Sequence, residues 1–352
     1  MRIAITFRDD QHLNQTWFGS GIAQNIKFYY DLFESMGHDV FMLVNSSLGM
    51  QHNGKSYQEL RRDDAYYGDV KLDFVIEAGV TVNREEQALL RSNCGAKIIG
   101  LRCGNQYNFA TEGMFVNQQL DVSQFIGGQD ALWILPHHKQ QAQWLSVLHG
   151  CEVSVVPYIW EPDFVERTFE TVSMPAVSDI VVMEPNISIL KNAMIPLAAI
   201  QSLYSSSPSS FGRATIYNSE RFANAENFLY NFVDNLPVLQ AHHDKVYFEP
   251  RKPFTEIFDQ PHVLLGHQVD NELNYLYNEA IYMGIPLVCN APPYAEVSYF
   301  YNDLNAKEAA TAIQLAIDKH EPAKVIEKGQ KFLNQYSISN SDVQKCYEHL
   351  LS

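Results

Sequence analysis

Residues 264–290, LLGHQVDNELNYLYNEAIYMGIPLVCN, decide the fold. An apolar strand at 262–265 leads into a polar loop at 267–271, and apolar residues then recur at three- and four-residue spacing. They are Leu273, Leu276, Ala280 and Met283. This spacing predicts an amphipathic helix with one face in a core. Gly284 and Pro286 should end the helix before a buried strand at 287–289, so the stretch predicts strand, loop, helix and strand.

Glu279 lies within this helix at the edge of its apolar face, one turn from Tyr275. A carboxylate at the edge of a packed face needs a hydrogen-bonding partner. Because a carboxylate can accept two hydrogen bonds at once, it suits the adjacent hydroxyls of a ribose. An ordinary glutamate on the helix surface is the alternative that spacing alone leaves open.

Strands alternate with helices along most of the chain, in two successive series. The first series has strands at 2–7, 40–44, 72–76, 97–101 and 153–156, another near Trp133, and helices at 22–36, 85–92 and 139–148. The second has strands at 179–183, 214–217 and 245–248, helices at 194–204, 223–236 and 254–258, and terminal helices at 306–319, 322–335 and 341–350. This order predicts an α/β protein with two facing Rossmann-like parallel-sheet domains, and ligands at the carboxyl ends of the strands.

The chain of 352 residues is long enough for two domains. We expect an N-terminal Rossmann-like domain at 1–165 and a C-terminal domain at 166–335, with 336–352 forming a helix that crosses back to the first domain. The linker is expected at 161–178, which has mixed polarity, two prolines and no clear period.

The net charge and the cysteine content limit the classes of ligand and metal site that we expect. A net charge of −16 opposes broad phosphate neutralisation on nucleic acid, although it permits a small basic pocket. The five scattered cysteines form no zinc-type spacing, so we expect reduced thiols and no metal site. The chain has no apolar run of membrane length, and residues 1–7 are too short and too soon charged for a secretory signal, so we expect a cytoplasmic protein.

Candidate functional residues follow the strands of the first domain, at the carboxyl ends where a ligand is expected. They include the carboxylates of Asp9 and Glu77. The others are Asp10, His12, Trp17, Gly21, Arg102 and Asn105. A structural ion pair between Glu77 and Arg102 is an equally favoured alternative.

The run Tyr-x-Glu-Ala-x-x-x-Gly-x-Pro at 277–286 resembles the donor-site helix of glycosyltransferases with the GT-B fold. This resemblance implies that Glu279 holds the ribose of a nucleotide sugar. Further pieces in the same order along the chain resemble one uncharacterised, glycosyltransferase-like family of bacteria and phages, known as domain of unknown function 2827. These pieces are Trp17, Gly21, Gln24 and Asn25; Glu77 and Gly79; Arg102, Gly104, Asn105 and Tyr107; Trp133, Leu135 and Pro136; Val156, Pro157 and Trp160; Glu184, Pro185, Asn186 and Lys191; Phe248, Glu249 and Arg251; and His267, Asn271, Asn274, Tyr275, Tyr277 and Glu279.

The resemblance implies transfer of a sugar from a nucleotide diphosphate sugar, most simply a UDP-sugar, to an acceptor hydroxyl. The donor is then expected in the domain at 166–335 and the acceptor on the domain at 1–165. Asp9 and Glu77 are the candidate bases, and the acceptor-side candidates are Asp10, His12, Trp17, Gly21, Arg102 and Asn105. Arg251 and Lys191 are the candidates for the diphosphate, and His267 is a catalytic candidate that binds a phosphate or the transferred sugar. The remaining donor-side candidates are Asn186, Asn271 and Tyr275. Asp270 and Glu272 are expected to cap the donor helix and to repel a phosphate from its end.

Several readings of the activity stay open. No Asp-x-Asp pair occurs in the sequence, which favours transfer without a metal. The acceptor is a glycan, a lipid-linked sugar, a protein or, for a viral gene, a modified base in DNA. A sugar-nucleotide 2-epimerase and a non-catalytic nucleotide-sugar-binding protein are the alternatives to a transferase.

Overall fold

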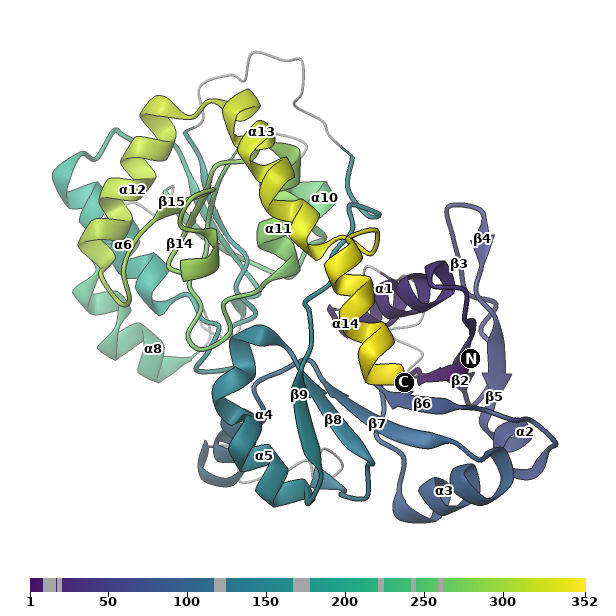
Figure 1. The fold of residues 1–352 in the computed structure, drawn as a ribbon. Coiled ribbons are helices and arrows are strands. Elements are labelled where there is room, and N and C mark those ends of the chain that lie inside the picture. The colour runs from purple at the N-terminus through teal and green to yellow at the C-terminus, as the bar shows by residue number, and fades with distance from the viewer. Residues whose placement is uncertain are drawn as a thin grey trace. The chain divides into compact units, whose positions relative to one another are not determined.

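The computed structural model describes residues 1–8, 17, 21–116, 125–166, 178–220, 225–241, 245–258 and 262–352. The chain divides into two compact units (Figure 1). Unit 1 contains residues 1–161 and 335–352, and unit 2 contains residues 162–334. Among the helices described, none is both long and apolar enough to cross a membrane.

Unit 1 is built on a seven-stranded parallel sheet with the order β5-β2-β1-β6-β7-β8-β9. Its strands are β1 (Arg2–Thr6), β2 (Asp39–Val44), β5 (Glu59–Arg61), β6 (Phe74–Glu77), β7 (Lys97–Arg102), β8 (Ala131–Ile134) and β9 (Glu152–Val155). A separate antiparallel hairpin joins β3 (Gln51–His52) to β4 (Lys55–Ser56). The sequence did not reveal β5 or this hairpin, because strands of two or three residues are too short to show a period.

The helices of unit 1 include short and irregular segments. They are α1 (Gly21–Ser35), α2 (Arg62–Tyr67), α3 (Arg84–Leu89), α4 (Gln106–Thr111), α5 (Ala142–His149) and α14 (Ser341–Leu351). Wider π-helical turns extend α3 through Leu90–Cys94 and α4 through Glu112–Val116, and a 3₁₀ segment at Pro136–Gln141 precedes α5. The expected helix at 139–148 therefore begins as a 3₁₀ turn.

Helix α14 is fixed to the rest of unit 1 by one buried tyrosine. The Tyr347 hydroxyl donates to the Pro157 carbonyl at 2.9 Å, so the Tyr29 hydroxyl, 2.8 Å away, must donate to Tyr347. The Tyr347 ring also packs edge-on against Phe33 of α1 and Trp133 of β8. These contacts place the last helix of the chain in the core of unit 1.

Unit 2 is built on a six-stranded parallel sheet with the order β12-β11-β10-β13-β14-β15. Its strands are β10 (Ile180–Val182), β11 (Ala214–Tyr217), β12 (Val246–Glu249), β13 (Val263–Leu265), β14 (Leu287–Cys289) and β15 (Tyr299–Phe300). Its helices are α6 (Met194–Ser206), α8 (Glu226–Asn231), α9 (Pro237–Ala241), α10 (Phe254–Ile257), α11 (Tyr275–Met283), α12 (Ala306–Lys319) and α13 (Pro322–Leu333), with a 3₁₀ turn at Val233–Asn235.

Both sheets reverse their strand order at one point. In unit 2 the chain runs outward from β10 to β11 and β12, and then resumes on the other side of β10 with β13, β14 and β15. In unit 1 the corresponding reversal lies between β1 and β6. Open parallel sheets bind ligands at the carboxyl ends of the two strands that flank such a reversal. The loops after β10 and β13 are therefore the first place to look for a ligand site in unit 2.

The stretch at 264–290 folds as expected into β13, α11 and β14, and Gly284 ends α11 with a φ of 76°. One expectation about this helix is wrong. Its amino-terminal cap is Asn274, whose side chain accepts from the Leu276 amide at 3.0 Å. Asp270 and Glu272 precede the cap, so they do not occupy the end of α11 as the sequence suggested.

Replacing Tyr347 by Phe should destabilise unit 1 by about 1–3 kcal/mol, because the Pro157 carbonyl and the Tyr29 hydroxyl lose their hydrogen-bonding partner. All four tryptophans of the sequence belong to unit 1, so tryptophan fluorescence during urea unfolding follows this unit alone. Tyr67→Phe is the control, because the Tyr67 side chain is 74% exposed. Equal urea midpoints for the two variants would contradict the role assigned to Tyr347.

Candidate functional site

A buried carboxylate, Glu184, joins the loops that follow β10 and β13. Its Oε1 atom accepts from the His267 amide at 2.9 Å and from the Tyr277 hydroxyl at 3.3 Å, while Oε2 accepts from the Gln268 side chain at 2.5 Å. Burial raises the pKa of Glu184 to about 7, although these hydrogen bonds oppose the shift. Glu184 thus holds both sides of the strand reversal of unit 2 together.

The loop from β10 to α6 is shaped by Asn186, which adopts the left-handed conformation with a φ of 56°. Its side-chain nitrogen donates to the carbonyls of Glu184, Tyr217 and Asn218 at 2.9–3.2 Å, and its oxygen accepts from the Ala193 amide at 2.8 Å. The amide group is therefore committed to backbone partners. This corrects the expectation that the Asn186 side chain binds a donor directly.

Lys191 lies on the same loop, and its charge is not matched within hydrogen-bonding distance. Its ammonium group makes no hydrogen bond or ion pair with any residue that the structure describes. Burial lowers the pKa of Lys191, and the Glu184 carboxyl group raises it in part. A cation held in this way is suited to an anionic ligand.

Two asparagines fix the loop after β13. Asn271 donates to the Gln268 side-chain oxygen at 3.1 Å, and so helps to orient the amide that binds Glu184. Asn290, which follows β14, accepts from the Gln268 backbone amide at 2.9 Å and donates to its carbonyl at 2.8 Å. The structure therefore brings Asn271 and His267 into one hydrogen-bonded network with Glu184.

Glu279 lies in the second turn of α11, and only 4% of its surface is exposed. Among the described residues, none donates a hydrogen bond to its carboxyl group or pairs with its charge. Burial alone raises its pKa to about 8. A buried carboxyl group without a partner destabilises the free protein, which is the behaviour expected of a group that meets its partner in a ligand.

Two other donor-side candidates, Tyr275 and Arg251, differ in burial. Tyr275 is the buried first residue of α11. Arg251 is exposed and follows β12, which lies three strand spacings from β13, or about 14 Å. The structure does not bring Arg251 against Glu279, and its contact with a diphosphate stays a prediction.

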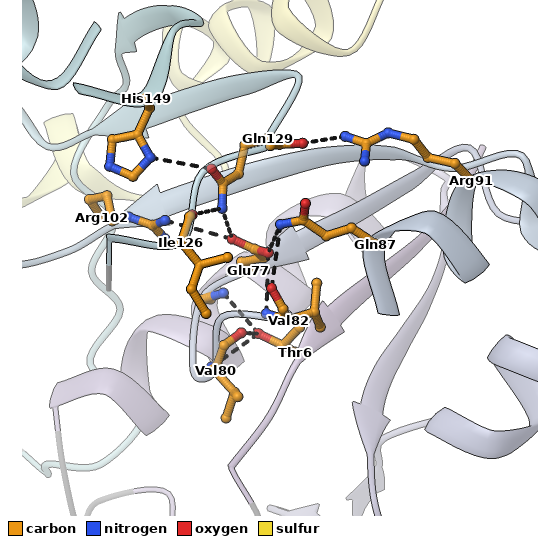
Figure 2. A network of polar contacts seen from close by, with 12 residues as sticks. Thr6, Glu77, Val80, Val82, Gln87, Arg91, Arg102, Ile126, Gln129 and His149 are labelled. Atoms are coloured by element: carbon orange, nitrogen blue, oxygen red, sulfur yellow. Dashed lines mark hydrogen bonds and ion pairs between the residues drawn. The ribbon is translucent and has the colours of Figure 1, made fainter. Parts of the chain in front are cut away.

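In unit 1, Glu77 and Arg102 form a buried ion pair with a separation of 3.7 Å (Figure 2). Glu77 Oε1 also accepts from the Val82 amide at 3.2 Å and the Gln87 side chain at 3.4 Å, and Oε2 accepts from Gln129 at 2.8 Å. Burial raises the pKa of Glu77, while Arg102 and these donors oppose the shift. Because both oxygens are occupied, the assignment of Glu77 as the base is corrected in favour of the structural ion pair.

The remaining candidates of unit 1 that the structure describes are a buried tryptophan, a helix cap and an exposed glycine. Trp17 is buried between Phe7 and Tyr57 and donates to the Gln51 carbonyl at 3.2 Å, so it belongs to the core and not to an acceptor surface. Asn105 caps α4 by accepting from the Asn108 amide at 3.0 Å. Gly21 is the exposed first residue of α1.

Three candidates, Asp9, Asp10 and His12, lie outside the described residues. The part of the chain that the structure describes contains no group of three or more side chains that could hold a metal ion. Sequence reasoning noted Glu184 as part of a motif but assigned it no role. Its position directly after a buried strand was the available signal, whereas its partners lie 83 to 93 residues away and left no local pattern.

Glu279→Gln should stabilise the free protein, and more strongly at pH 8 than at pH 5. A raised pKa means that the folded chain binds this proton more tightly than the unfolded chain, so the free energy of unfolding falls as the pH rises from about 4.5 to about 8. The variant removes that loss of stability, which is on the order of 4 kcal/mol at pH 8. Melting temperatures across this range measure the difference, with the exposed Glu327→Gln as control. A pH-independent difference would contradict an unpaired Glu279.

The fold is similar to those of solved proteins at very low sequence identity. The N-terminal domain of Candida albicans trehalose-6-phosphate phosphatase has a TM-score of 0.61 and 10% identity, with 99% of this chain and 95% of that one covered. A trehalose-6-phosphate synthase has a TM-score of 0.57 and 12% identity over 99% and 98%. The pneumococcal O-GlcNAc transferase GtfA, solved with UDP and GlcNAc, has a TM-score of 0.51 and 10% identity over 82% of this chain and 58% of its own.

These similarities confirm the expected fold class of two Rossmann-like parallel-sheet domains, as in GT-B glycosyltransferases. At such identities they show the fold alone. The chain spans less than two thirds of the length of GtfA, and no curated protein matches the sequence. The family model described as "Protein of unknown function (DUF2827)" matches residues 3–351, and the chain belongs to that family.

Proposed function

We propose that this protein is a glycosyltransferase that takes its sugar from a nucleotide diphosphate donor, bound in unit 2 at the carboxyl ends of β10 and β13. The observation that supports this most strongly is that Glu279 and Lys191, two buried ionisable groups of one Rossmann-like unit, make no side-chain hydrogen bond or ion pair with any described residue. A nucleotide diphosphate offers a matching partner to each of them.

Glu279 is suited to the nucleoside part of the donor. The two oxygens of its carboxyl group can accept hydrogen bonds from the two adjacent ribose hydroxyls. These bonds replace the water that burial has removed, so binding recovers free energy that the free protein lacks. The carboxyl group should lose its proton when it binds the ribose, because hydrogen bonds to the charged form lower its pKa.

Lys191 is suited to the diphosphate. The leaving nucleoside diphosphate gains negative charge as the bond to the sugar breaks, and a nearby cation in a dry site stabilises that charge. The 13-residue helix α6 begins three residues after Lys191. In its first turn the Met194 amide donates to the Asn192 side chain at 3.1 Å and Pro196 has no amide hydrogen, so only the Ile195 amide is available to a ligand. We therefore assign the diphosphate to Lys191, with Arg251 as a second cation to be tested.

The finer parts of the proposal rest on the sequence. A UDP-sugar is the donor to test first, and the absence of an Asp-x-Asp pair favours transfer without a metal ion. If the reaction inverts configuration, the base is sought among Asp9, Asp10 and His12, since Glu77 is committed to Arg102. The acceptor is a hydroxyl of a glycan, a lipid-linked sugar or, in a viral setting, a modified base in DNA.

Lys191→Ala should weaken the binding of UDP at least tenfold and leave uridine unaffected, because only UDP carries the phosphates. Glu279→Gln should weaken the binding of UDP and the binding of uridine by similar factors, because both ligands carry the ribose. Thermal shifts measure the difference, since a ligand at 100 times its Kd stabilises by about 2.7 kcal/mol. Lys324→Ala is the matched control on the surface of unit 2.

Arg251→Ala in the same assay tests the second cation. Incubation of the wild type with the donor alone separates the proposed reaction from its rival, because an epimerase returns a rearranged sugar and a transferase returns intact or hydrolysed donor. Equal loss of UDP binding in Lys191→Ala and Lys324→Ala would rule out the proposed diphosphate site.

A further inference from the structure

His267 and Tyr301 make a relay of hydrogen bonds at the carboxyl end of β13. The Tyr301 hydroxyl lies 2.9 Å from the Gly266 carbonyl oxygen and 2.9 Å from His267 Nδ1. A carbonyl oxygen can only accept, so the single phenolic proton of Tyr301 is donated to Gly266. Nδ1 of His267 must then carry the proton that the Tyr301 oxygen accepts. The opposite arrangement would leave a buried carbonyl without its hydrogen bond.

This relay leaves Nε2 of His267 as a lone-pair acceptor whenever the ring is neutral. Burial lowers the pKa of His267 to about 4, so the ring is neutral at physiological pH. Nε2 has no hydrogen-bonding partner among the residues that the structure describes. The side chain is also held in place, since only 2% of the residue is exposed and its backbone amide donates to Glu184.

His267 Nε2 belongs to the same end of the unit 2 sheet as the proposed site for the nucleotide sugar. His267 follows β13 directly across the strand reversal from the loop that carries Lys191. A neutral nitrogen lone pair repels phosphate oxygens but accepts readily from a hydroxyl group. Lys191 and His267 are therefore suited to different parts of one donor.

We propose that Tyr301 is a positioning residue that keeps His267 in the Nδ1-protonated tautomer, so that Nε2 accepts a hydrogen bond from a hydroxyl of the transferred sugar and not from the diphosphate. The identity of the ligand rests on the proposed function. The assignment of the tautomer depends only on the Gly266 carbonyl, the Tyr301 hydroxyl and His267 Nδ1. It can therefore be tested in the free protein.

A second tyrosine–histidine pair supplies a matched control. Tyr299 of β15 lies 3.3 Å from Nδ1 of His320, whose Nε2 lies 2.8 Å from the Gly284 carbonyl. Because that carbonyl must accept, His320 is protonated at Nε2 and accepts the Tyr299 hydroxyl at Nδ1. The two pairs therefore hold opposite tautomers.

The first experiment records nitrogen-15 spectra of the histidine rings, with His267→Gln and His320→Gln assigning the two signals. In the wild type, His267 should show a protonated Nδ1 and an unprotonated Nε2, and His320 the reverse. Tyr301→Phe should convert the His267 signal to a mixture of tautomers, and Tyr299→Phe should leave it unchanged. An Nε2-protonated His267 in the wild type, or no change in Tyr301→Phe, would overturn the relay.

The second experiment compares the affinities for UDP and for the UDP-sugar that stabilises the wild type most among UDP-glucose, UDP-galactose and UDP-N-acetylglucosamine. His267→Ala and Tyr301→Phe should each change the Kd of UDP less than twofold. Each should raise the Kd of the UDP-sugar at least fivefold. Equal weakening of both ligands would place His267 on the diphosphate and overturn the sugar assignment.

A wild type that binds neither UDP nor any of these sugars would overturn the proposed function and the sugar contact together. The nitrogen-15 result would stand in that case. The two failures are therefore distinguishable.

Discussion

The carboxyl group of Glu184 is the contact on which the site in unit 2 depends. It follows β10, yet its donors belong to the loop after β13 and to α11, so a single group aligns three separate elements. Strand pairing fixes only the sheet and leaves the loops beyond it free to vary. By binding His267, Gln268 and Tyr277 together, Glu184 sets the positions of the groups around the strand reversal before any ligand arrives.

Burial reduces the negative charge that Glu184 and Glu279 carry near neutral pH. Glu184 and Glu279 both have raised pKa values, of about 7 and about 8, so each is partly protonated near neutral pH. A fully ionised pair in a chain with a net charge of −16 would oppose an anionic donor. Partial protonation reduces that repulsion, which agrees with the proposal that Lys191 binds a diphosphate.

The sequence predicted those features that have a local cause. Helix α11 and its end at Gly284 followed from apolar spacing and a glycine, and the alternation of strands and helices gave the parallel sheets. Side-chain roles depended on distant partners and were harder to foresee. Glu77 pairs with Gln129 across 52 residues, and Asn186 binds carbonyls more than 30 residues away, so neither could be separated from a ligand-binding residue by spacing. Asn274 was overlooked as a cap because Asp270 and Glu272 offered commoner capping chemistry nearby.

The return of α14 to unit 1 has a consequence for biosynthesis. Unit 2 is one continuous segment, whereas unit 1 needs residues 335–352 to complete its core. Domains tend to fold as they emerge from the ribosome. The strands of unit 1 are translated earlier than α14 and cannot complete their core without it. The Tyr29 hydroxyl lacks its native partner until Tyr347 has been translated. Unit 2 can therefore reach its native state while unit 1 is still an incomplete nascent sheet.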